Sequence, residues 1–165
     1  MRSDEMQIVT LGTLSPRSNG DVLAMRRKLR AVAQRFGITS SKATRLAAAA
    51  SDHAKSALRS SALEVLVGLD GSGAEQELWV EFAVSHLEGN TLLQAGFDQV
   101  EPLDAQRRGW RASCKIDPIT TTEPTINWCQ AIIAEQSVEE LVEALHELVE
   151  RYRQSRDGKA GHARD

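Results

Sequence analysis

The chain has 165 residues, of which 41% are apolar and 26% are charged, as is typical of one soluble globular domain and not of a disordered chain. The formal net charge of -3 provides no global positive field for nucleic acid. The chain contains no apolar run long enough to cross a membrane, and its polar first residues lack the hydrophobic region of a signal peptide. We therefore expect a cytoplasmic protein that binds neither nucleic acid nor a membrane.

The charge is distributed unevenly along the chain. Residues 1–60 contain 11 Lys and Arg against 4 Asp and Glu, a net charge of +7, and the remaining residues contain 9 against 19, a net charge of -10. Such a division is typical of solvated helix faces that differ in sign, and it is also what complementary surfaces for a partner or for self-association would require.

The chain begins with a predicted strand and an amphipathic helix. Residues 7–14 mix β-branched and apolar side chains, which favours an edge or early strand, and residues 15–20 read as a loop. From Asp21 to Phe36 apolar residues recur every three or four positions among arginines, which predicts a helix. Gly37 is expected to end this helix in the left-handed conformation.

A second helix is predicted directly after this stop. Thr39, Ser40 or Ser41 can cap it by accepting a hydrogen bond from a free backbone N–H group. The helix is rich in alanine between Leu46 and Leu58, and such small residues allow close packing on a sheet or on another helix. We expect it to be mostly buried.

The middle of the chain predicts a β-hairpin followed by a loop. Residues 63–69 and 78–84 have the composition of strands, and residues 70–73, Asp-Gly-Ser-Gly, favour a turn. Residues 85–108 have weak periodicity, so we expect a loop there with one or two short helices. A second pair of strands is predicted at residues 112–116 and 125–133.

The end of the chain predicts one more helix. Ser137 and Glu140 form a capping box, and apolar residues recur at helical spacing from Val138 to Tyr152. The order of elements indicates an α+β fold, a two-layer sandwich in which helices cover one face of a mixed sheet, with an added C-terminal helix. We expect a domain over residues 1–135, a helix over residues 136–154 and a flexible tail over residues 155–165.

The second helix ends in the sequence Ser-Asp-His-Ala-Lys-Ser, residues 51–56, and the stretch DVLAMRRKLRAVAQRFGITSSKATRLAAAASDHAKSAL resembles the opening of the anti-sigma-factor serine kinases, a branch of the GHKL ATPases. In that branch the second helix carries a Glu-x-x-x-Asn box, whose acid assists as a base and whose asparagine binds the magnesium ion that bridges the ATP phosphates. Residues four apart share a helix face. Asp52 stands at the acidic position and Ser56 at the asparagine position. Lys55 is a candidate to meet a phosphate, although a lone lysine beside such a box is more often a solvated charge.

Other positions of the family pattern are also changed. The family has an aspartate that binds adenine after the central strand, where this chain has Val84 or Ser85, followed only by Gly89. The family's glycine-rich phosphate cradle corresponds to the region 90–109, which holds only the isolated Gly96 and Gly109. These departures, with Ser56 in place of asparagine, point to a degenerate nucleotide site.

Three hypotheses follow for function. The first is a degenerate GHKL-like regulatory module without a cofactor, which acts by binding a protein, such as an anti-sigma antagonist, a sigma factor, a kinase or a phosphatase in a bacterial partner-switching pathway. The second is an active ATP- and magnesium-dependent serine/threonine kinase with Asp52 as catalytic base and Ser56 and Lys55 toward the nucleotide. The third is a structural module that forms a homodimer. The basic first helix and the acidic C-terminal helix are the candidate interaction faces.

The remaining chemically distinctive residues have ordinary structural interpretations. His53 points away from Asp52 by about 100° on a helix and is expected at the surface. The histidines at 86 and 146 lack a third convergent ligand, so we expect no metal site. Two cysteines are expected as buried free thiols in strands, and three tryptophans are expected to pack in the core: Cys114, Cys129, Trp79, Trp110 and Trp128.

Overall fold

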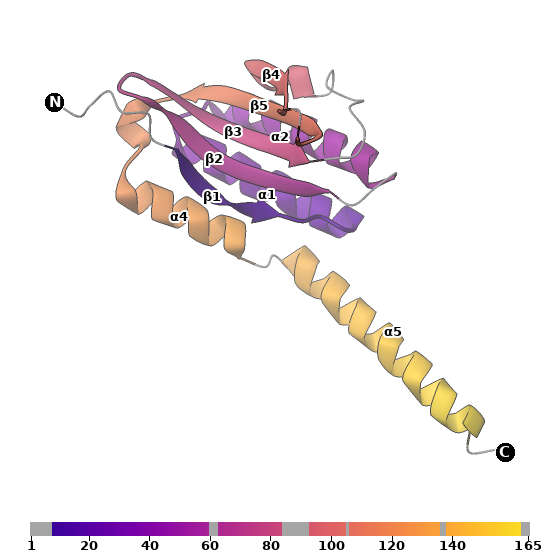
Figure 1. Ribbon diagram of the computed structural model, residues 1–165. Helices are drawn as coiled ribbons and strands as arrows, with labels where there is room; N and C mark the ends of the chain where they lie inside the picture. The colour runs from indigo at the N-terminus through magenta and orange to yellow at the C-terminus, as the bar shows by residue number, and fades with distance from the viewer. Residues whose placement is uncertain (1–7, 60–62, 84–92, 105, 136–137, 163–165) are drawn as a thin grey trace. The chain divides into compact units, whose positions relative to one another are not determined.

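The computed structural model describes residues 8–59, 63–83, 93–104, 106–135 and 138–162. It divides into two compact units, residues 1–135 and residues 136–165. The first unit has a five-stranded sheet with helices α1 and α2 on one face (Figure 1). The predicted α+β class and its two-layer arrangement are confirmed.

The first unit starts with the predicted strand and helical hairpin: β1 (Val9–Leu14), α1 (Asn19–Arg35) and α2 (Ser40–Leu58). The Ser18 hydroxyl accepts a hydrogen bond of 3.2 Å from a backbone N–H in the first turn of α1. Thr39 does the same for α2 at 3.3 Å. Gly37, between the helices, has a φ of +84°. The Thr39 cap and the glycine stop are therefore as predicted, whereas the Ser18 cap was not predicted and starts α1 two residues before Asp21.

The other strands complete a sheet of order β1-β2-β3-β5-β4: β2 (Glu64–Ser72), β3 (Glu75–Ala83), β4 (Gln99–Pro102) and β5 (Gly109–Ile116). All four pairings are antiparallel, so the prediction of a mixed sheet was wrong. The reason lies in the connection between β1 and β2. Helices of 17 and 19 residues form a hairpin that returns the chain to the end of the sheet where β1 stops. The next strand must then run back beside β1.

The predicted hairpin between β2 and β3 is present, but its strands extend farther than the sequence indicated. Ser72 pairs with Glu75, so the turn lies at Gly73 and Ala74, and Gly73 has a φ of +57°. β4 was not predicted, because an edge strand of four mostly exposed residues has too few positions to show a period. Residue 84, at the end of a predicted strand, and residues 85–92 of the predicted loop lie outside the described residues.

The region predicted as a strand at residues 125–133 is instead a helix, α4 (Glu123–Ala134), which follows the short 3-10 helix η1 (Pro118–Thr120). The Thr122 hydroxyl caps α4, and Pro124 lies in its first turn, where a missing N–H costs nothing. α4 packs along the edge strand β1 (Figure 1). A Cβ atom on Gly12 of β1 would lie 2.6 Å from Cγ2 of Ile133. The absence of a side chain at Gly12 therefore lets α4 lie close against β1.

The core lies between the sheet and the helices. Alternate strand residues meet there with the apolar sides of α1 and α2 and with Cys129 and Ile133 of α4, and these side chains are almost completely buried. The largest completely buried side chains include Phe36, Phe82, Met25, Leu29 and Leu46.

The second unit is a single helix, α5 (Val138–His162). It includes residues 155–162, for which the sequence predicted a fraying tail. Ser137 of the predicted capping box lies outside the described residues.

Both cysteines are buried free thiols, as predicted, although Cys129 lies in helix α4 and not in a strand. Burial raises the pKa of the Cys114 thiol. It also raises the pKa of Cys129 to about 11. Since the thiolate is the reactive form, both side chains combine low access with low reactivity.

We predict that neither thiol of the folded chain reacts measurably with a disulfide reagent at pH 8 within minutes. Both should react at once in guanidinium chloride, because unfolding exposes them and returns their pKa values to the ordinary range. Counting released chromophore with and without denaturant checks this. Rapid labelling of one thiol under native conditions would contradict the described packing of that cysteine.

Candidate functional site

The residues at and beside the positions of the Glu-x-x-x-Asn box, Asp52, Lys55 and Ser56, are called the box here and lie on the exposed side of α2. Asp52, Lys55 and Ser56 are all exposed, and the spacing of four residues places Asp52 and Ser56 on one face. A carboxylate, an ammonium group and a hydroxyl are thus available to a ligand that approaches from solvent. The hydroxyl of Ser51, beside them, is turned inward and donates a hydrogen bond of 2.9 Å to the Ala48 carbonyl.

His53 is not at the surface, and the prediction that it would be was wrong. Its side chain is 1% exposed, and its ring meets that of Phe82 edge to face at a centroid distance of 4.8 Å. The rotation of about 100° per helical residue explains this. Because Asp52 faces solvent, its neighbour is turned toward the sheet.

Segment 93–98 packs directly against the first half of α2, before residues 51–56. Leu93 is completely buried, and a Cβ atom on Gly96 would lie 2.7 Å from the Cα atom of Leu46. Lys42 of α2 forms an ion pair of 2.7 Å with Asp98. The backbone N–H of Lys115 in β5 donates to the same carboxylate at 2.9 Å. Asp98 therefore connects this segment to α2 through an ion pair and to β5 through a hydrogen bond.

The two glycines of the predicted cradle region serve backbone packing. Gly96 permits the contact with α2, and Gly109 lies where a Cβ atom would be 1.8 Å from the Phe82 carbonyl oxygen. The positions expected to replace the adenine-binding acid, at 84 and 85, and Gly89 lie outside the described residues. His86 lies outside them as well.

The uneven charge of the sequence becomes a separation between two faces of the first unit. From Asn19 to Leu58 the helical hairpin contains eight Lys and Arg against two Asp. Arg27, Arg30 and Arg45 are among its exposed side chains. The strands contain six acids and two bases, all at positions that alternate with the buried ones and therefore lie on the outer face of the sheet: Glu64, Asp70, Glu75, Glu77, Glu81, Glu101, Arg111 and Lys115.

The outer face of the sheet is organised around Trp79, a feature that the sequence analysis missed. The indole ring lies over Gly68 of the neighbouring strand, where a Cβ atom would be 2.1 Å from ring atom Cζ2. The Arg111 guanidinium stands 4.9 Å from the centre of a Trp79 ring. Trp79 is thus buried outside the core, whereas Trp110 and Trp128 pack partly buried against it. Glycine inside an otherwise regular strand was the available signal.

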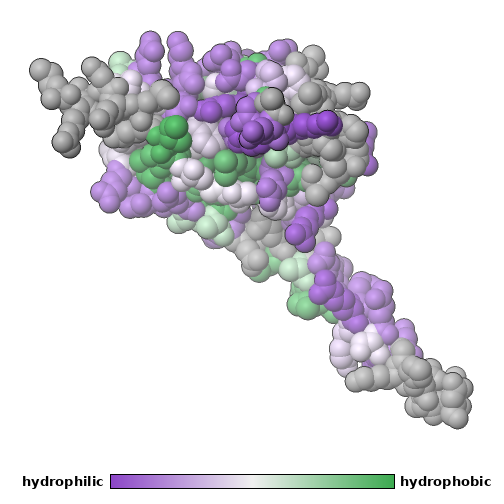
Figure 2. Space-filling model, viewed as in Figure 1, coloured by the Kyte–Doolittle hydropathy of each residue, from purple (hydrophilic) through white to green (hydrophobic). Residues whose placement is uncertain are grey.

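Ion pairs extend from this stack across the outer face. Arg111 pairs with Asp70 and lies 3.7 Å from Glu81. Arg107 donates to Glu81 at 2.9 Å and to Asp104 at 3.3 Å. Because the Glu81 side chain is only 8% exposed, its two arginine partners offset its loss of hydration. Figure 2 shows strongly hydrophilic residues on this face beside hydrophobic ones.

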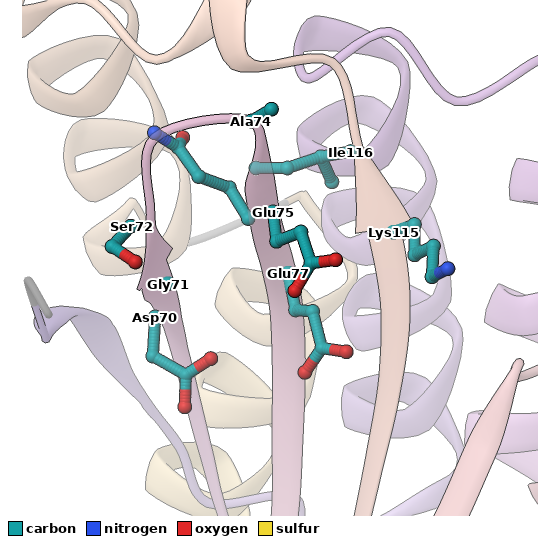
Figure 3. A pocket seen from close by; sticks show the side chains of 9 residues that line it. Asp70, Gly71, Ser72, Ala74, Glu75, Glu77, Lys115 and Ile116 are labelled. Carbon is teal, nitrogen blue, oxygen red and sulfur yellow. The ribbon is translucent and has the colours of Figure 1, made fainter. Parts of the chain in front are cut away.

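A hollow of about 410 Å³ lies at the tip of the β2–β3 hairpin, away from the box. The carboxylates of Asp70, Glu75 and Glu77 line it, while the Lys115 ammonium points away from them (Figure 3). The described residues contain no group of His, Cys, Asp and Glu side chains arranged to hold a metal ion. Within the same residues, no helix combines the length and apolar character needed to span a membrane.

Comparison with models of protein families gives no match. Comparison with curated proteins gives no significant match either.

We predict that Gly68→Ala destabilises the fold by about 1–3 kcal/mol, because the new methyl group collides with the indole of Trp79. In a Trp79→Leu background the same change should cost less, since the smaller side chain leaves room. Urea denaturation of the four chains of this double-mutant cycle measures the coupling. Additive effects would contradict the stacked arrangement.

The Asp98 contacts give a prediction for acid stability. Burial raises the pKa of Asp98, but hydrogen bonds from Lys42 and the Lys115 N–H outweigh it and hold the pKa below its usual value. We expect Asp98→Asn to lose about 1 kcal/mol at pH 7. Because the unfolded pKa is about 3.9, this difference should be complete above that pH and shrink as the pH falls through the lower pKa of the folded state.

Urea denaturation of both chains at pH 7 and near pH 3 measures this difference. Glu101→Gln, a change of an exposed acid on β4, serves as the control and should leave stability within about 0.5 kcal/mol. A difference between the native chain and Asp98→Asn that stays constant down to the lower pH would contradict the role given to Asp98.

Proposed function

We propose that this chain is a regulatory module that acts by binding another protein and that does not use a nucleotide efficiently. The observation that carries the proposal is the basic outer surface of the α1–α2 hairpin, where exposed arginines stand almost without acidic neighbours in sequence. Such a surface favours a protein partner with an acidic face, because complementary potentials increase the association rate and select the partner. The α5 helix, with its acidic first half, offers a second surface.

The condition of the box supports the same proposal. The resemblance to the anti-sigma-factor branch of the GHKL ATPases implies a magnesium-binding asparagine where Ser56 stands. The serine hydroxyl reaches less far from the backbone than the amide oxygen of asparagine. We therefore expect that function requires neither ATP nor magnesium.

The resemblance also suggests the setting. A module of this kind would act in a bacterial partner-switching pathway in the cytoplasm, with an anti-sigma antagonist, a sigma factor, a kinase or a phosphatase as its partner. The exposed arginines of the α1–α2 hairpin favour a partner with an acidic surface.

A second candidate function is an ATP-dependent serine/threonine kinase. One observation favours it: Asp52, Lys55 and Ser56 are exposed together, so a nucleotide could reach a base, a cation and a hydroxyl from solvent. In that case Asp52 would accept the proton of the attacking hydroxyl or orient it.

Calorimetric titration with ATP and magnesium separates these two functions. For the regulatory module we expect no detectable heat of binding at millimolar ATP. Micromolar binding that Asp52→Ala abolishes, and that the change Ser41→Ala in the first turn of α2 leaves intact, would overturn the proposal and support the kinase.

The protein-binding surface is tested by charge reversal. In cross-linking experiments with extract of the source cells, a partner that the native chain captures should be lost with Arg30→Glu/Arg45→Glu, because both arginines are exposed on the basic surface. The matched control, Glu64→Arg/Glu101→Arg, reverses two exposed charges on the opposite face and should retain it. Equal capture by both variants would argue against the basic surface.

A further inference from the structure

The α5 helix exposes a row of large apolar side chains. Leu145 and Leu148 are each 61% exposed, and Tyr152 is 69% exposed. Figure 2 shows hydrophobic residues on the first part of this helix. A contiguous apolar surface of this kind marks an interaction site, whereas single exposed apolar residues are ordinary. The members of this apolar stripe are Leu141, Val142, Leu145, Leu148, Val149 and Tyr152.

The spacing of the stripe is that of a helix that packs against another helix. Leu141, Leu145, Leu148 and Tyr152 follow one another at intervals of four, three and four residues, as the seam positions of a heptad do. Val142 and Val149 widen the seam on one side. At a rise of about 1.5 Å per residue the four seam positions span about 16 Å.

The described residues of the first unit offer no matching surface. Their large exposed apolar side chains are Ile8, Leu23 and Ile119, which lie before β1, on α1 and on η1. Single residues on separate elements cannot cover a stripe of six. A second copy of α5 has a stripe of the same length and spacing, so it is self-complementary.

The charges of α5 favour one orientation of such a pair. Residues 139–150 contain five Glu and no Lys or Arg, whereas residues 151–159 contain four Lys and Arg and one Asp. Parallel helices would place like charges side by side at both ends. In the antiparallel arrangement that sets Leu145 opposite Leu148, residues 151–154 of one copy, which include two Arg, lie along residues 139–142 of the other, which include two Glu.

We propose that α5 pairs with α5 of a second copy of this chain as an antiparallel helix pair. Leu145 lies opposite Leu148 of the other copy, and Leu141 lies opposite Tyr152. This register places the position of Arg153 beside that of Glu140 in the second copy. The pairing requires neither the basic surface nor the box, so it stands or falls independently of the proposed function.

Sedimentation equilibrium of the full chain tests the pairing. We expect a particle of twice the 18.1 kDa chain mass at tens of micromolar protein. Leu145→Gln/Leu148→Gln removes four buried leucines from the pair but keeps good helix formers, so the dissociation constant should rise by more than about a hundredfold. Glu147→Gln/Glu150→Gln, a matched change on the same helix, should leave the dimer intact.

The other outcomes contradict the proposal. A native chain that stays monomeric at these concentrations would show that α5 is covered by another partner or by its own chain. A dimer that survives Leu145→Gln/Leu148→Gln would show that the copies meet through a different surface. Protection of Cys114 and Cys129 in each variant serves as the check that the first unit remains folded.

Disulfide formation tests the orientation. A mixture of Leu141→Cys and Tyr152→Cys chains should form the mixed disulfide rapidly under mild oxidation, because antiparallel pairing brings these positions together. Tyr152→Cys alone should link to itself slowly, and the native chain, whose cysteines are buried, should not link at all. Rapid self-linking of Tyr152→Cys would establish a parallel pair and overturn the proposed arrangement.

Discussion

The close packing of α2 is the constraint on which the first unit depends. Five alanines are buried on this helix, four of them at intervals of four, three and four residues, and their small side chains let other parts of the chain approach its backbone. On one side His53 reaches Phe82 of the sheet, and elsewhere Gly96 lies against Leu46. Because so much of α2 is covered, only a narrow strip is left to solvent. That strip contains Asp52, Lys55 and Ser56, so the same packing that stabilises the fold decides which residues a ligand can meet.

The separation of charge between the two faces follows from the different repeats with which helices and strands place their side chains. A helix with a repeat of 3.6 residues turns its apolar residues to the sheet and its arginines outward, whereas a strand with a repeat of two places every second residue on the outer face. The basic first third of the sequence forms the helix layer, and the acidic middle forms strands. A sign change along the chain thereby becomes a difference between opposite surfaces. On the sheet side Asp70, Glu81 and Arg111 form ion pairs beside Trp79, while several arginines of the helix layer are exposed.

Much of the fold could be predicted because its signals are local. The caps at Ser18 and Thr39, the stop at Gly37 and the periodicity of α1 act within a few residues. The helix α4 was missed because residues 125–133 are rich in β-branched and apolar side chains, and the cap at Thr122 with Pro124 was the weaker signal that prevailed. The exposure of the box residues and the burial of His53 depend on which side of α2 meets the sheet, and the Trp79 stack depends on strand register. The orientation of α2 on the sheet and the register of the strands depend on contacts between distant segments, so neither could be predicted from one stretch of sequence.

The two units differ in how much of their apolar surface is buried. The described residues of the first unit form a hydrophobic core of their own. A single helix of 25 residues that exposes leucine and tyrosine is only marginally stable by itself, since most helical stability in proteins comes from packing of the apolar face. A second helix supplies that packing. Joining two chains through α5 would also give one particle two basic surfaces, and a partner with two acidic sites would then bind with the gain in avidity that effective concentration provides. The apolar stripe and the basic surface would in this way contribute to the same interaction.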